Sequence, residues 1–282
     1  MVWVVLAFLV IVFLTVVAPL MRQRAVVAAR GRRLSALQRE RGSQVITIIH
    51  RQEQIGLFGV PLVRFIDIDD SEQVLRAIRM TPDDRPIDLV LHTPGGLVLA
   101  AKQIASALSD HPAEVIAVVP HYAMSGGTLI ALAADRIVVD QHSVLGPVDP
   151  QLGQYPAASV LAALDAPGER DDQTLILADM SRKAIVQVES FVSRLLEPKL
   201  GAARASEVAR VLSTGTWTHD HPLQRTELEM LGLSVSVGIG EEERELLDLY
   251  PQARGREASV EYVPAAPLPR RGNGAVRGRS LL

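Results

Sequence analysis

The chain opens on an apolar run and then turns basic. Residues 2–20 carry only one polar side chain, Thr15. As a helix this run would span about 28 Å, close to the roughly 30 Å hydrocarbon core of a bilayer. Five arginines follow closely: Arg22, Arg24, Arg30, Arg32 and Arg33. The pattern predicts a transmembrane anchor over residues 1–21 and a basic, helical juxtamembrane stalk over residues 22–43.

The arginine cluster also predicts an orientation. Positive charge beside a membrane span stays on the cytoplasmic side, so the rest of the chain is expected in the cytoplasm of a single-pass cell-membrane protein. A secretory signal would carry its positive charge before the apolar run and a small-residue cleavage site after it. Here only Met1 precedes the run. An export signal, cleaved or retained, is the alternative.

After residue 44, short β-branched runs alternate with helical spacing. Strands are predicted at residues 45–50, 65–68, 87–91, 115–119 and 136–139. Helices are predicted after a cap at residues 69–71 and then over 97–108, 128–134, 174–196, 203–212, 223–231 and 241–249, with loops at 54–61 and 143–156 and a break at Pro198. The alternation is typical of an α/β fold of βαβ units around a parallel sheet, here over residues 44–250. Residues 251–282, rich in Pro, Gly and Arg, are predicted to be a disordered tail.

Composition narrows the classes of function. The net charge of −3 and the 4% aromatic content give no reason to expect nucleic acid as a partner. No cysteine is present, so disulfides and thiol catalysis are excluded. No dinucleotide G-x-G-x-x-G motif follows a first strand, and no cofactor is predicted. His219 and His221 have the spacing of metal ligands, but no further ligands are spaced to join them, so no metal is predicted. A loop wall or a subunit contact is favoured for His219, Asp220 and His221.

Two glycine-rich turns carry the candidate chemistry. Ser125 lies in His-Tyr-Ala-Met-Ser-Gly-Gly-Thr directly after the strand at 115–119, and Pro-Gly-Gly at 94–96 follows the strand at 87–91. The turns after parallel strands meet at one edge of a sheet. A serine on a sharp strand-to-helix turn exposes its hydroxyl, and glycines let backbone N–H groups point at one place. The pattern predicts a nucleophile with an oxyanion hole, as acyl transfer requires.

The serine needs a base, and the residues leave several candidates. The chain has only three lysines, Lys102, Lys183 and Lys199, beside many arginines, which cannot give up their proton. Lys183 lies mid-helix, where burial would lower its pKa and let it act as a neutral base. Histidines near the turns are His92, His121 and His142. Asp149 and Asp220 could orient a base but are not primary candidates.

The two turns, at residues 88–96 and 121–127, resemble the paired motifs of the ClpP/crotonase superfamily. They are most similar to those of its membrane-associated serine peptidases: signal peptide peptidase A, the archaeal stomatin-cleaving proteases and the serine dehydrogenase proteinase (SDH) group. Residues 134–140, 145–150 and 213–220 look especially like the SDH group. The resemblance implies a ClpP/crotonase-like fold of repeated ββα (βαβ) units and a homo-oligomer.

The resemblance also implies roles for single residues. Ser125 is the expected nucleophile, and Gly126 with Gly95 or Gly96 the expected oxyanion donors. In signal peptide peptidase A the base is a helical lysine some fifty to sixty residues after the serine, a spacing that Lys183 matches. In ClpP the base is a histidine after the next strand, and His142 lies a few residues before that place.

The expected function is therefore a membrane-anchored serine endopeptidase with a Ser125–Lys183 dyad. Its expected partners are a peptide or membrane-protein substrate, the membrane and further copies of the chain, and no cofactor. Two alternatives remain. A crotonase-type acyl-CoA enzyme would share the fold and the oxyanion hole, but it would need no serine and would usually place a carboxylate in the pocket. A catalytically inactive membrane scaffold would need neither.

Overall fold

A five-stranded parallel sheet forms the centre of the protein. The computed structural model describes all residues except 1, 51–53, 56–60, 63 and 251–282. The strands are β1 (Gln44–Ile49), β4 (Ile87–His92), β5 (Val115–Val119), β7 (Arg136–Val139) and β11 (Val235–Val237), in the order β1-β4-β5-β7-β11. The predicted α/β fold with a parallel sheet is confirmed.

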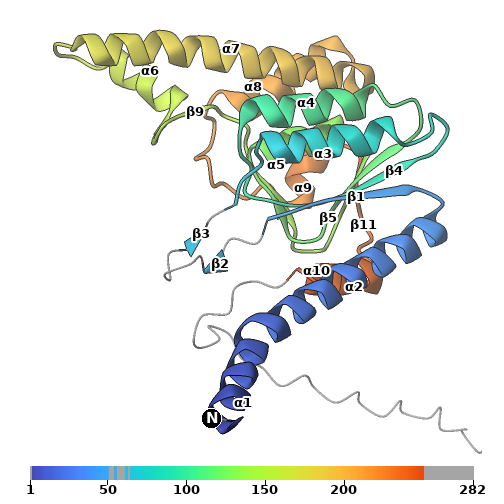
Figure 1. The fold of residues 1–282 in the computed structure, drawn as a ribbon. Helices are drawn as coiled ribbons and strands as arrows, with labels where there is room; N and C mark the ends of the chain where they lie inside the picture. The colour runs from blue at the N-terminus through green and yellow to red at the C-terminus, as the bar shows by residue number, and fades with distance from the viewer. Residues whose placement is uncertain (1, 51–53, 56–60, 63, 251–282) are drawn as a thin grey trace, which may run out of the picture.

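The crossover helices lie together on one face of the sheet (Figure 1). The helices α3 (Ile68–Arg79), α4 (Val98–Ser109) and α5 (Gly126–Ala133) join successive strands. Because each crossover is right-handed and each strand is added on the same side of the last, the helices are placed on one face. Outside them pack α7 (Asp172–Leu200) and α8 (Ala202–Ser213), and α6 (Ala157–Asp165) with the first part of α7 extends beyond the body.

The other face of the sheet is covered by two helices from opposite ends of the chain, α2 (Ala18–Arg41) and α10 (Glu241–Asp248). Side chains alternate along β4, so Leu89 and Leu91 join the larger core under α4 and α5, while Val90 joins a smaller one. The smaller core contains Leu37, Val45, Val90, Val118, Val138, Ile239 and Leu246. Burial on both faces explains why the strands read as continuous apolar runs.

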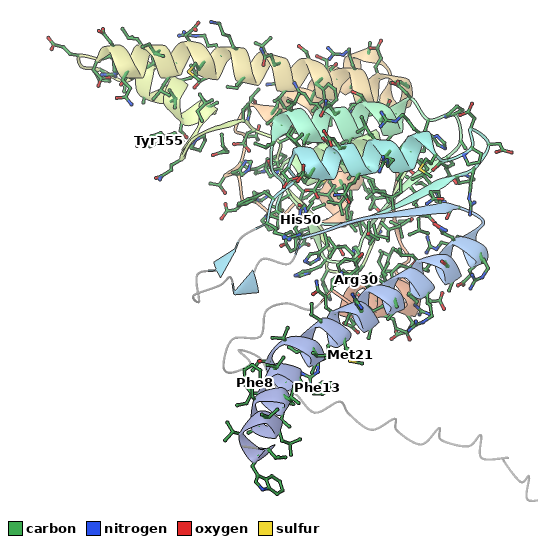
Figure 2. The ribbon with its side chains drawn as sticks, viewed as in Figure 1. Phe8, Phe13, Met21, Arg30, His50 and Tyr155 are labelled. Atoms are coloured by element: carbon green, nitrogen blue, oxygen red, sulfur yellow. The ribbon has the colours of Figure 1, made fainter. Side chains whose placement is uncertain are left out.

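The N-terminal segment is one continuous helix made of α1 (Val2–Val12), the π-helical turn η1 (Phe13–Val17) and α2. It is long and apolar enough to cross a membrane. Phe8, Phe13 and Met21 point outward from it, away from the rest of the chain (Figure 2). The π turn ends two residues before Pro19 and contains Thr15, whose carbonyl the proline ring would meet in a regular α-helix.

Several local expectations are wrong. The first crossover helix begins at Ile68 rather than after residues 69–71, because Asp67 and Asp70 form a capping box. Pro198 does not break α7, which ends two residues later at Leu200, where little of the helix remains to be disrupted. Short strands occur in segments that were expected to be loops or turns. They are β2 (Gln54–Ile55), β3 (Pro61–Leu62), β6 (Tyr122–Ala123), β8 (Val144–Leu145), β9 (Gln151–Leu152) and β10 (Tyr155–Pro156). The helix α9 (Arg225–Met230) is shorter than predicted. The predicted tail lies outside the described residues.

Candidate active site

Ser125 occupies a strained turn at the N-terminus of α5. Its φ of 50° and ψ of −114° make it the only non-glycine residue with positive φ in the described part of the chain. The turn is tied by bonds from the Gly127 N–H to the Met124 carbonyl at 2.7 Å and from Thr128 Oγ1 to the Ala123 carbonyl at 2.7 Å. Such a strand-to-helix turn presents the serine hydroxyl away from the backbone, and residues held in such conformations cluster at active sites.

The two glycine turns touch each other, as predicted from their places after β4 and β5. The Met124 N–H donates to the Thr93 carbonyl at 3.0 Å. A Cβ at Gly95, where φ is 105°, would lie 2.8 Å from the Ser125 Cβ, and a Cβ at Gly96 would lie 2.2 Å from the Ile66 carbonyl oxygen. Only glycine permits this approach, so the turn at residues 94–96 is held directly against the serine.

The backbone N–H groups of Gly95, Gly96 and Gly126 differ in whether they already have a hydrogen-bond acceptor. The Gly95 N–H donates to Thr93 Oγ1 at 3.2 Å, whereas Gly96 and Gly126 line a pocket together with Ser125. Among the described residues no backbone carbonyl accepts from the N–H of Gly96 or Gly126. The first N–H groups of a helix have no acceptor within it and carry its positive end. Gly126 begins α5 and Gly96 lies two residues before α4, so both N–H groups are candidates for an oxyanion hole.

A buried chain of side chains supports the first turn. Thr93 Oγ1 lies 2.9 Å from His50 Nδ1, and His50 Nε2 lies 3.2 Å from Asp70 Oδ2. Burial opposes ionisation of Asp70, but hydrogen bonds from His50 and the Asp67 N–H outweigh it, and its pKa lies below its ordinary value. The turn that carries Gly95 is therefore fixed by side chains from β4, α3 and the end of β1.

The pocket at Ser125 is small, about 100 Å³. Its polar lining comes from the two turns and from the loop after β8, and its apolar lining from α4, α5 and α7. The lining residues are Gly96, Val98, Ser125, Gly126, Leu129, Val148, Asp149, Pro150, Gln151 and Val188. A small, largely apolar pocket with a few polar groups around a nucleophile suits the acyl part of a substrate.

Asp149 is a pocket residue that sequence reasoning did not place among its main candidates. It is 2% exposed. Its Oδ1 lies 2.8 Å from His219 Nδ1, and its Oδ2 accepts from Gln151 Nε2 at 2.7 Å. The signal available in the sequence was a lone aspartate between two prolines and a histidine seventy positions later. Only the fold shows that the two side chains meet.

Lys183 does not meet Ser125 within this chain. Its side chain is 67% exposed, and its Nζ bonds to Asp179 Oδ2 at 2.5 Å on the same helix. Val188 is the residue of α7 that lines the pocket, and five residues at about 100° each put Lys183 roughly 140° away from it around the helix. The Ser125–Lys183 dyad stays a prediction.

The other candidate bases are also accounted for. His142 is exposed in the turn after β7, outside the pocket lining. His92 is buried, stacks with His121 and packs at a tilt against the Tyr122 ring. Lys102 donates to the Gln187 carbonyl at 3.2 Å and is not in the pocket lining either. No group of three or more His, Asp or Glu side chains in the described residues is arranged to hold a metal ion.

Comparison with known proteins assigns the chain to a family. Residues 1–275 match the family described as ClpP-like SDH-type serine proteinase. Two proteins of Methanocaldococcus jannaschii, MJ0137 and MJ1495, are 54% and 52% identical over 254 and 258 residues, covering 89% and 91% of this chain and 89% and 88% of theirs. A serine-to-alanine mutant of the 1510-N membrane-bound stomatin-specific protease has a similar structure at 22% identity, with a TM-score of 0.45 over 65% of this chain and 79% of its own. This chain therefore belongs to the ClpP-like SDH-type serine proteinases.

Proposed function

We propose that this protein is a membrane-anchored serine endopeptidase whose nucleophile is Ser125. The observation that carries the proposal is the strained turn at Ser125, which sets its hydroxyl in a pocket beside the N–H groups of Gly96 and Gly126. Membership of a serine proteinase family makes peptide hydrolysis the expected chemistry.

The reaction would proceed in two steps. Ser125 Oγ attacks the carbonyl carbon of the peptide bond, its proton passes to a base, and the Gly96 and Gly126 N–H groups hold the oxyanion. The base returns the proton to the leaving amine, which frees the acyl-enzyme. Water then attacks the ester, the base takes its proton, and that proton restores the Ser125 hydroxyl as the acid product leaves.

The Ser125–Lys183 dyad remains the base assignment that the family resemblance favours. Since Lys183 lies on the side of α7 away from its own pocket, the dyad requires Lys183 to serve the Ser125 of a neighbouring copy or α7 to turn. The first arrangement needs a homo-oligomer. Lys183→Arg keeps the charge but cannot accept a proton, so it would be inactive under either arrangement.

The membrane part of the proposal rests on the N-terminal helix. We expect one span over residues 1–21 and the peptidase domain in the cytoplasm, because arginines follow the apolar segment. A reporter fused after Leu282 should then behave as cytoplasmic, and protease added outside intact cells should leave the domain uncut. Digestion from outside would reverse the orientation. In this place the protein would meet cytoplasmic peptides or membrane proteins as substrates.

Ser125→Ala tests the function directly. The variant should lose labelling by a fluorophosphonate probe, and peptide hydrolysis should fall more than about a thousandfold, as expected when a covalent nucleophile is removed. Ser190→Ala, which changes an exposed serine on α7, is the matched control and should keep both activities. Hydrolysis that survives in Ser125→Ala would refute the proposal and favour an acyl-CoA enzyme or a scaffold instead.

A further inference from the structure

The pocket holds a buried carboxylate that the reaction above does not use. Asp149 lines it together with Ser125 and is 2% exposed. Removing a carboxylate from water is costly unless it is paired. Gln151 satisfies one of its oxygens and His219 the other. His219 is not itself among the residues that line the pocket, but it contacts one of them, Asp149. A carboxylate that holds a histidine by Nδ1 is the positioning half of the arrangement that activates serines in peptidases of unrelated folds.

The contact with Asp149 fixes how a neutral His219 carries its proton. An ionised carboxylate can only accept, so the proton lies on Nδ1, at 2.8 Å from Asp149 Oδ1, and Nε2 is left with a free lone pair. The His219 side chain is 31% exposed, and within the described part of the chain no residue bonds to Nε2. An imidazole held by Nδ1 with an open Nε2 is ready to accept a proton.

Short hydrogen bonds tie the segments that carry these residues to the nucleophile's helix. The Gly146 N–H donates to Thr128 Oγ1 at 3.0 Å, one turn after Ser125. Leu145 and Leu223 exchange backbone bonds of 3.1 and 2.8 Å, which anchor the far end of the His219 loop. The three segments are therefore held in one frame at the pocket.

We propose that His219 is the general base for Ser125 and that Asp149 positions it, so that one chain contains a Ser125–His219–Asp149 triad. The proposal rests on the proposed function. His219 Nε2 takes the Ser125 proton as Oγ attacks and gives it to the leaving amine. It then takes a proton from water and returns it to Oγ, while Asp149 stays ionised throughout. This assignment and the Ser125–Lys183 dyad are alternatives, and the variants below distinguish them.

The test compares His219→Asn with His221→Asn in the full-length protein. The Asn amide can replace the Nδ1 donor to Asp149 but cannot accept a proton, so His219→Asn keeps the loop contact and loses the base. Its hydrolysis rate and its rate of fluorophosphonate labelling should fall by about 10²- to 10⁴-fold. His221→Asn changes a neighbour that instead stacks on Trp217 and contacts Glu227, and it should keep most activity.

Two further variants separate catalysis from structure. His219→Ala should regain activity when imidazole is added, which a loss of folding would not allow. Asp149→Asn should lower the rate of hydrolysis on its own but should lower it no further in a His219→Asn background, because the two residues act as a unit.

If Ser125 is still labelled by the probe and His219→Asn hydrolyses peptide at nearly the normal rate, the triad is wrong while the proposed function stands. If Lys183→Arg is inactive and His219→Asn is active, the base is Lys183. Hydrolysis without Ser125 would instead refute the proposed function itself.

Discussion

At the scale of single residues, the site depends on a conformation that serine does not favour. Ser125 combines φ 50° with ψ −114°, a region that glycine adopts freely and other residues enter at a cost of about 1–3 kcal/mol. The neighbouring structure holds it there, because its carbonyl accepts from the Leu129 N–H at 3.0 Å and the Gly95 turn packs so closely that a Cβ at Gly95 would lie 2.8 Å from the Ser125 Cβ. The strain therefore arises from the backbone conformation at position 125 and does not depend on the serine hydroxyl.

Ser125→Gly and Ser125→Ala should both be inactive but should differ in stability. Glycine relieves the backbone strain of the folded state. Part of that gain in stability, about 0.5–1 kcal/mol, is offset because a glycine gives the unfolded chain more conformational freedom to lose on folding. Alanine keeps the strain. We expect the free energy of unfolding of Ser125→Gly to exceed that of Ser125→Ala by about 1 kcal/mol, measured by urea denaturation in detergent. Equal values would mean that the turn is not strained.

Whether a residue of the candidate site could be predicted from the sequence depends on how far it lies along the chain from its partners. Ser125, Gly126, Gly95 and Gly96 could be predicted because each turn has a local pattern and each follows a strand. Asp149 and His219 could not, because their pairing depends on how the loops after β8 and α8 fold back over α5. The face of α7 on which Lys183 lies was equally hidden, since it depends on which side of that helix packs against the body.

At the scale of elements, α5 is held at both ends. Ser125 lies at its start, and at its end Lys199 Nζ donates to the carbonyls of Leu132 at 2.8 Å and Ala134 at 2.5 Å. These carbonyls belong to the last turn of the helix, where a cation is favourable. Burial lowers the pKa of the Lys199 amine to about 8, against the opposing effect of Asp135. A lysine expected only to suit a helix end instead connects α7 to the helix of the nucleophile.

The lowered pKa of Lys199 predicts a pH-dependent stability. Below about pH 8 the amine is charged in both the folded and unfolded states, and its desolvation cost is fully present. Between pH 8 and the ordinary lysine value of 10.5, the unfolded state binds more protons, so stability rises with pH. The difference in unfolding free energy between the wild type and Lys199→Met should therefore grow in favour of the wild type from pH 8 to pH 10. A constant difference would exclude this effect.

Prediction of the elements from the sequence succeeded where periodicity was strong. The buried strands β1, β4, β5 and β7 stand out as apolar runs, and α4, α5, α7 and α8 follow helical spacing. The helix α6 and the strand β11 were missed, because both are short and lie next to glycine and proline signals that are typical of loops. β11 has only three residues and is recognisable as a strand only beside β7.

At the scale of the whole molecule, ion pairs and hydrogen bonds join the long N-terminal helix to α10. Three stalk arginines contact the C-terminal helix or its end: Arg41 pairs with Glu243, Arg33 with Glu245, and Arg30 donates to the Leu249 carbonyl while covering the Tyr250 ring. Arg30 lies on the side of α2 that faces α10 (Figure 2). These arginines are therefore engaged by protein groups.

The central residue of these contacts between α2 and α10 is Glu243, which is 2% exposed and lies under α2. Arg41 bridges it to the buried Asp88 at the start of β4, with 3.3 Å between Arg41 Nη1 and Asp88 Oδ2. Replacing one partner of such a group leaves the others buried with less compensation. Because α2 continues directly from η1 and α1, this network couples the apolar N-terminal helix to the sheet that ends at the turns of the candidate site.

Glu243→Gln should therefore loosen the domain from its stalk. We expect a loss of about 1.5–3 kcal/mol in the free energy of unfolding, the range for hydrogen bonds to charged groups. Glu242→Gln, a change at a partly exposed neighbour 4.0 Å from Arg33, should have almost no effect. Protease digestion of the full-length protein in vesicles should release the domain faster in Glu243→Gln than in Glu242→Gln, because α2 and α10 separate more often. Equal release rates would show that the apolar contacts of Leu37 and Leu246 hold the stalk without the ion pair.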